Sequence, residues 1–195
     1  MSDGIDLLDR LRALGALREG HFLLASGRHS DRYVEKFDLL RRPDATQVVC
    51  AGIADRFSGE GIDVVVGPTT GGVILAFEVA RQLGVAAAYA ERRGEGENGR
   101  EFRRGARFDD GARVLLVDDI LTTGGSIRET LAALATHPVT VVAVAVLVDR
   151  SGGRLDFGVP LTAVATLDIA TWAAAACPLC AAGTPLTKPG TTVAV

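Results

Sequence analysis

Short apolar runs alternate along the chain with segments whose apolar residues recur at helical spacing. The runs that predict buried strands span 62–68, 85–92, 113–120, 138–150 and 161–168. The segments that predict helices span 43–57, 71–84 and 125–137. Pro43 suits a first helical position, and Gly84 suits the end of a helix. The pattern predicts an α/β fold, Rossmann-like, with a parallel sheet and helices on both faces.

The N-terminal flank of this alternating region and one segment within it have different patterns. Leucines at helical spacing predict a helix over 6–17, and 20–40 is rich in strand formers around a Ser-Gly turn. The segment 92–106 holds glycines and charges with hardly an apolar residue. We therefore predict a mobile loop there, flanked by a small hairpin, within a single domain spanning 1–195.

Composition narrows the class of protein. The chain has 195 residues, 48% of them hydrophobic, and a formal net charge of −3, so one domain with a proper core is expected and a broad nucleic-acid surface is not. No apolar run approaches a membrane span, and the N-terminus lacks the pattern of a secretion signal, so we predict a cytoplasmic protein. Positive charge is concentrated at Arg92, Arg93, Arg100, Arg103, Arg104 and Arg107.

Candidate chemistry gathers where the predicted strands end. Gly67, Asp118 and Asp149 stand at the carboxyl ends of three of them. Ligands of parallel sheets bind beyond these ends. We therefore expect the three following loops to converge on one crevice.

The loop 122–126 has the composition of a phosphate site. It lies between a predicted strand and a predicted helix, and consists of Thr122, Thr123, Gly124, Gly125 and Ser126. The glycines let backbone N–H groups turn inward, the hydroxyls add donors, and a helix N-terminus adds partial positive charge. Together they predict a cup for a phosphate monoester.

Two adjacent carboxylates precede this cup. Asp118 and Asp119 would repel a bare phosphate, but they suit a ligand that also carries vicinal hydroxyls or a divalent cation. A sugar phosphate offers both features. Another strand–loop–helix anion site, as in flavodoxin-like or receiver folds, is the alternative.

Four stretches carry a resemblance to a known family. "VLLVDDILTTGGS" resembles the phosphoribosyl-diphosphate (PRPP) signature of type I phosphoribosyltransferases. "GHFLLASGRHSDRYVEK" and "VLVDRSGG" resemble the N-terminal segment and a strand end of orotate phosphoribosyltransferases, and "CPLCAAGTPLTKPG" resembles the tail of one bacterial and archaeal subgroup. The resemblance covers the chain from Leu14 to Gly190.

The resemblance implies a fold and a reaction. The fold would be that of type I phosphoribosyltransferases, with 1–40 forming a small N-terminal hood and 92–106 a mobile active-site loop. The enzyme would transfer the phosphoribosyl group from PRPP to orotate, giving orotidine 5'-phosphate and pyrophosphate in pyrimidine biosynthesis. It implies Mg²⁺ as cofactor and a homodimer whose loop serves the neighbouring subunit.

It also implies roles for individual residues. Asp118 and Asp119 would bind the ribose hydroxyls, near a Mg²⁺ ion held mainly by PRPP, and the loop 122–126 would hold the 5-phosphate. The pyrophosphate loop would be Thr69, Thr70, Gly71 and Gly72. Arg150 would pair with the orotate carboxylate, while Thr122 and Tyr33 would lie beside the base.

One departure from the family pattern lies in the predicted loop. Relatives usually carry lysines there. Where they have Glu-Lys, this chain has Glu91-Arg92, followed by Arg93. Arginine stays protonated, so it can neutralise a leaving diphosphate but hardly donate a proton. We therefore expect Arg92, with Arg93, to act by charge. A transferase for another base, or a PRPP-binding regulator, is the alternative function.

The cysteines leave their role open. Cys177 and Cys180 form a CxxC pair, which supplies half of a tetrahedral zinc site. Such a pair is a reduced turn beside Pro178, or is completed by the same pair of a second subunit. His29 receives no catalytic role.

Overall fold

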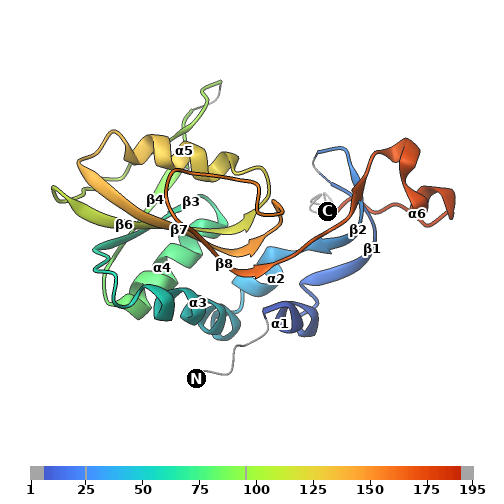
Figure 1. Cartoon of the computed structure of the whole chain (residues 1–195), viewed down its shortest axis with the longest axis horizontal. Helices are drawn as coiled ribbons and strands as arrows, with labels where there is room; N and C mark the ends of the chain where they lie inside the picture. Colours follow the sequence, from blue (N-terminus) through green and yellow to red (C-terminus); the bar gives the residue numbers. More distant parts are fainter. Residues whose placement is uncertain (1–6, 25, 95, 190–195) are drawn as a thin grey trace. The chain divides into compact units, whose positions relative to one another are not determined.

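The computed structural model describes residues 7–24, 26–94 and 96–189. The chain divides into two compact units (Figure 1). The central unit spans Leu40–Thr166. The terminal unit joins the chain up to Leu39 with the chain from Leu167 onward.

A six-stranded sheet forms the frame of the central unit. Its strands are β3 (Val64–Pro68), β4 (Ala86–Arg92), β5 (Arg100–Glu101), β6 (Ala112–Leu121), β7 (Val139–Asp149) and β8 (Leu161–Thr166). They lie in the order β5-β4-β3-β6-β7-β8. All neighbours pair in parallel except β5, which runs antiparallel to β4. The predicted parallel sheet is confirmed, and β5 adds an antiparallel edge.

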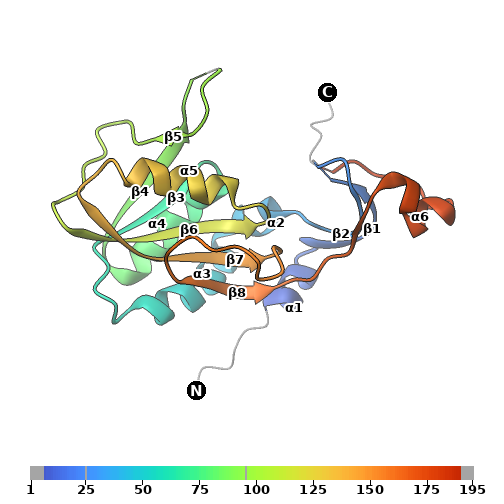
Figure 2. The ribbon, with the colours of Figure 1, turned by 45° about the horizontal axis from the view of Figure 1, so that its top comes forward.

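Helices cover both faces of this sheet. Helices α3 (Pro43–Phe57) and α4 (Gly71–Leu83) lie on one face, and α5 (Gly125–Leu134) lies on the other (Figures 1 and 2). Pro43 opens α3, and Gly84 ends α4 in the left-handed conformation that glycine tolerates, with φ 72°. These helix boundaries follow the sequence prediction, except that α5 ends three residues earlier.

The central strands supply the core. Val66, Val114, Leu116, Val144 and Val146 are fully buried between the two helical layers. On the α5 face the core is completed by loop side chains, among them Phe102, Phe108 and Phe157. A sheet buried on both faces is closely packed and holds the ends of its strands in fixed positions.

The terminal unit has a small antiparallel sheet in the order β1-β2-β9. Its elements are α1 (Leu7–Ala13), β1 (Leu17–Leu23), β2 (His29–Val34), α2 (Lys36–Leu40), β9 (Thr171–Trp172), a 3₁₀ turn (Ala174–Ala176) and α6 (Pro178–Ala181). The predicted helix over 6–17 is wrong beyond Ala13, because Gly15 turns the chain at φ 68° and Leu17 begins β1. Residue 6 lies outside the described residues.

Candidate active site

Three neighbouring strands open their loops on one edge of the central sheet. The parallel strands β3, β6 and β7 end at Pro68, Leu121 and Asp149. The Arg150 N–H donates to the Leu121 carbonyl at 2.8 Å, which sets Arg150 beside the start of the loop 122–126. The predicted convergence of three loops is therefore confirmed.

The two carboxylates lie inside the last four residues of β6. Asp118 and Asp119 are 6% and 3% exposed. The Asp118 carboxylate accepts the Asp119 N–H at 2.9 Å and the Ser126 hydroxyl at 2.6 Å. Asp119 accepts the Ile120 N–H at 2.6 Å. These bonds orient both acids at the strand end. The Ser126 hydroxyl, which we predicted would donate to a phosphate, donates to Asp118 in this structure.

The loop 122–126 turns sharply into α5. Gly124 caps the helix at φ 77°, and a Cβ atom there would lie 2.9 Å from the Phe157 ring. Only glycine fits that conformation and that space. The turn places the first N–H groups of α5, with the exposed Thr122 and Thr123, at the end of β6. Unsatisfied N–H groups at a helix start are the donors an anion needs.

The loop 69–72 packs against the same acids. Its first peptide bond, Thr69–Thr70, is cis. A Cβ atom on Gly71 would lie 1.8 Å from Asp119 Oδ2, and one on Gly67 would lie 2.0 Å from the Gly72 carbonyl oxygen. The backbone at Gly71 thus touches the Asp119 carboxylate, so the predicted pyrophosphate loop and the acids form one site.

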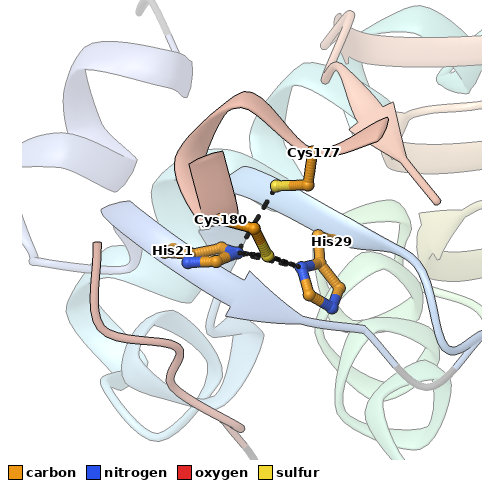
Figure 3. Close-up of side chains that lie close together, drawn as sticks. All are labelled: His21, His29, Cys177 and Cys180. Atoms are coloured by element: carbon orange, nitrogen blue, oxygen red, sulfur yellow. Dashed lines mark hydrogen bonds between the residues drawn. The ribbon is translucent and has the colours of Figure 1, made fainter. Parts of the chain in front are cut away.

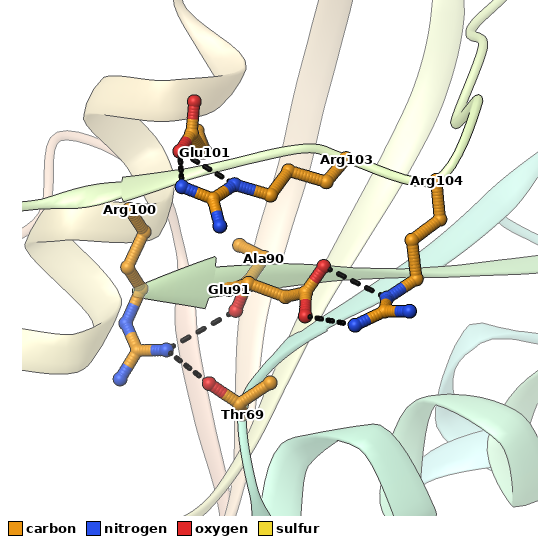
Figure 4. A network of polar contacts seen from close by, with 7 residues as sticks. All are labelled: Thr69, Ala90, Glu91, Arg100, Glu101, Arg103 and Arg104. Atoms are coloured by element: carbon orange, nitrogen blue, oxygen red, sulfur yellow. Dashed lines mark hydrogen bonds and ion pairs between the residues drawn. The ribbon is translucent and has the colours of Figure 1, made fainter. Parts of the chain in front are cut away.

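A buried arginine supports this loop from β5 (Figure 4). Arg100 is 3% exposed and donates from Nη1 to Thr69 Oγ1 at 3.0 Å and to the Ala90 carbonyl at 3.1 Å. Its Nε lies 3.3 Å from Glu129 Oε2 on α5. Burial lowers the pKa of the Arg100 guanidinium, which Glu129 opposes. From the sequence, Arg100 is only one of the clustered arginines, because no local pattern signals that it is buried.

Comparison with known proteins places this arrangement in a family. Residues 39–174 match the model of the phosphoribosyl transferase domain. The orotate phosphoribosyltransferase of Caldanaerobacter subterraneus subsp. tengcongensis is 44% identical over 184 residues, covering 94% of this chain and 95% of that protein. The orotate phosphoribosyltransferase of Methylobacterium sp. is 47% identical, over 95% and 94%. The crystal structure of the Aeropyrum pernix enzyme of that name matches with a TM-score of 0.68 and 32% identity, over 83% of this chain and 93% of that one.

The chain belongs to the orotate phosphoribosyltransferase family. The type I phosphoribosyltransferase fold predicted from the sequence is confirmed by the same comparisons. Within the described ranges, no helix has both the length and the apolar character needed to cross a bilayer.

The arginine-rich segment of this family member is partly a hairpin. Arg92 is the last residue of β4 and pairs in register with Arg100 on β5. Arg104 binds Glu91 through two contacts of 3.1 Å, and Arg103 Nε donates to Glu101 at 2.7 Å (Figure 4). Arg92 and Arg93 are exposed. The structure thus separates Arg103 and Arg104, which have acidic partners, from the two arginines that we predicted to meet the diphosphate.

Tyr33, the remaining predicted site residue, lies in the terminal unit. It is on β2 and its ring lies 5.8 Å from that of Phe22. Its place beside the base stays a prediction that follows from the family resemblance.

Proposed function

We propose that this chain catalyses transfer of the phosphoribosyl group from PRPP to orotate, giving orotidine 5'-phosphate and pyrophosphate for pyrimidine nucleotide synthesis. The observation that carries the proposal is the shared edge of β3 and β6, where a helix N-terminus, two oriented carboxylates and a glycine loop meet. Relatives named orotate phosphoribosyltransferase align with this chain over almost their whole length, which supports the choice of orotate.

The proposed chemistry follows from this layout. Orotate N1 attacks carbon 1 of PRPP as the bond to pyrophosphate breaks, and the N1 proton passes to pyrophosphate or solvent. Positive charge grows on the ribose ring, and negative charge grows on the departing oxygen. Asp118 and Asp119 hold the ribose 2- and 3-hydroxyls, the loop 122–126 holds the 5-phosphate, and the loop 69–72 holds the pyrophosphate. Donors fixed in advance stabilise the negative charge on the leaving oxygen, and the two carboxylates stabilise the positive charge on the ribose ring.

Mg²⁺ fits this site as an ion that is bound mainly by the substrate. Both Asp118 oxygens and one Asp119 oxygen accept hydrogen bonds from the protein. A dedicated protein cage would need more free carboxylate oxygens, whereas Mg²⁺ commonly binds substrate phosphates with one or two nearby carboxylates. We therefore propose that PRPP holds Mg²⁺, with Asp118 and Asp119 near it, so that the ion offsets diphosphate charge.

Arg150 is proposed to hold the orotate carboxylate, with Thr122 and Tyr33 beside the base. Replacing Arg150 by alanine is expected to raise KM for orotate about 10- to 100-fold, because the charge-assisted hydrogen bonds to the carboxylate are lost. The KM for PRPP should change much less. Arg154→Ala, an exposed arginine four residues on, is the matched control. Steady-state kinetics with each substrate varied in turn measure both constants. An unchanged KM for orotate would remove Arg150 from the orotate site.

Arg92 is proposed to neutralise the leaving diphosphate by charge, with Arg93 beside it. We expect Arg92→Ala to lower kcat/KM by about tenfold or more, and Arg92→Lys to retain most activity because it keeps the charge. Arg56→Ala, an exposed arginine on α3, controls for loss of surface charge. If neither Arg92 variant changes kcat/KM, the assignment is wrong.

The function itself is tested by following orotate consumption by ultraviolet absorbance with PRPP and Mg²⁺. Hypoxanthine, xanthine, adenine and uracil serve as competing bases under the same conditions. We expect turnover with orotate alone. Turnover of another base, with none of orotate, would contradict the proposal.

Assembly and location are further parts of the proposal. We propose a homodimer in which the segment 92–106 serves the neighbouring active site, and a cytoplasmic location. Sedimentation velocity at micromolar concentration tests the first. Mixing an Arg92 variant with an Asp119 variant tests loop sharing, because hybrid dimers would regain one intact site.

A further inference from the structure

Four potential metal ligands meet in the terminal unit, apart from the residues assigned to catalysis (Figure 3). His21 lies on β1 and His29 on β2, while Cys177 and Cys180 flank the start of α6. Their ligand atoms all lie within 4.8 Å of one another. The fold thus brings a CxxC pair to two histidines that precede it by about 150 residues.

The spacing of these atoms matches a tetrahedral zinc site. Zn–N bonds of about 2.05 Å and Zn–S bonds of about 2.3 Å place neighbouring nitrogens about 3.3 Å apart, and nitrogen and sulfur about 3.6 Å apart. Here His21 Nε2 and His29 Nδ1 are 2.9 Å apart. The nitrogen–sulfur distances are 3.5 Å for His21–Cys177, 3.7 Å for His21–Cys180 and 3.3 Å for His29–Cys180. Shifts of a few tenths of an ångström would bring these four contacts to ideal values.

The surroundings orient His21 for metal binding. Its Nδ1 lies 2.8 Å from the Thr184 carbonyl oxygen, so Nδ1–H donates there and Nε2 presents its lone pair to the cluster. A ring N–H held by a carbonyl is the usual support for a metal-bound histidine. The backbone of His21 is also held in place, since Thr187 N–H donates to the His21 carbonyl at 2.8 Å.

Burial separates this cluster from a surface coincidence. His21, His29 and Cys177 are 3%, 5% and 3% exposed, whereas Cys180 is exposed and leaves a path for an ion. Buried polar side chains need hydrogen-bond or metal partners, and here the polar atoms of these residues turn toward one another. A redox CxxC pair would not need two buried histidines turned toward its sulfurs.

We propose that His21 Nε2, His29 Nδ1, Cys177 Sγ and Cys180 Sγ bind one Zn²⁺ ion in a closed structural site. Four protein ligands leave no position for water or substrate, which is the pattern of structural zinc. The ion joins the β1–β2 hairpin to the C-terminal segment around α6. This unit has a small sheet in which β9 contributes only two residues, so a metal crosslink stabilises it where apolar burial is limited.

Metal content of the full-length, untagged protein purified without chelator tests the site first. We expect inductively coupled plasma mass spectrometry to find about one Zn²⁺ per chain. The Cys180→Ser variant, which changes an exposed side chain, should hold less than about 0.2 Zn²⁺ per chain. Cys50→Ala is the matched control, because Cys50 lies on α3 in the central unit, and it should keep the metal. Chelation of the wild-type ion should lower Tm, and re-addition of Zn²⁺ should restore it.

Cobalt provides a readout that is independent of any variant. Co²⁺ exchanged into the wild-type protein should give the intense visible bands of tetrahedral coordination and a thiolate charge-transfer band. Three results would overturn the proposal. The first is a wild-type protein that takes up no stoichiometric Zn²⁺ or Co²⁺, and the second is a Cys180→Ser variant that retains the metal. The third is a metal-free protein with a Cys177–Cys180 disulfide whose Tm does not fall when chelator is added. Activity is not the readout, so failure here would leave the transferase proposal standing.

Discussion

Replacing Asp118 or Asp119 by asparagine is expected to lower kcat/KM by about 100-fold or more. Both acids are nearly fully buried at the end of β6, so their charge acts through a medium that screens it weakly. Asparagine keeps the shape and one oxygen acceptor, but it removes the charge that stabilises the developing positive ribose ring. It also turns one acceptor for a ribose hydroxyl into a donor.

Asp63→Asn provides the control for this change. Asp63 precedes β3 at the opposite end of the sheet, and its carboxylate accepts the Arg113 N–H at 2.8 Å. We expect activity within about twofold of wild type, as for a surface substitution away from the site. Steady-state rates, with circular dichroism to check folding, measure the effect. Near wild-type turnover in Asp118→Asn and Asp119→Asn would contradict the roles given to both acids.

Gly71→Ala is expected to reduce kcat/KM by about 100-fold through a single added methyl group, since displacing a catalytic group by about 1 Å costs that much. The new Cβ atom would lie 1.8 Å from Asp119 Oδ2 and 3.2 Å from Leu40 Cδ1. Either the loop 69–72 or the Asp119 carboxylate must move. Both are assigned to PRPP, so its binding should weaken as well.

Gly59→Ala is the matched control, because a Cβ atom there meets nothing within 4 Å. Calorimetric titration with PRPP and Mg²⁺, beside kinetics and Tm, separates a local effect from unfolding. A Gly71→Ala enzyme that binds PRPP and turns over normally would show that the contact between the loop and Asp119 has no part in catalysis.

Local pattern predicted the central unit well. Helix α3 begins at Pro43 and ends at Phe57, where its apolar spacing and its proline indicated. The buried strands were found because both faces of a parallel sheet are covered, which leaves near-continuous apolar runs. The site loops followed, since glycine and hydroxyl residues stand directly after those strands.

Features that depend on distant residues were missed. The two-residue strand β9 is too short to show a pattern, and it pairs with β2, some 140 residues earlier in the chain. Arg100 is buried by contacts with Thr69 and Glu129, which local sequence does not indicate. The two histidines beside the CxxC pair were missed for the same reason, because they precede it by about 150 residues.

The most direct measurement is a crystal structure of the protein with PRPP and Mg²⁺. We expect the 5-phosphate within about 3 Å of the backbone N–H groups between Thr122 and Ser126, and the ribose hydroxyls at the same distance from Asp118 and Asp119. A PRPP molecule whose 5-phosphate lies elsewhere, or whose hydroxyls avoid both acids, would contradict it.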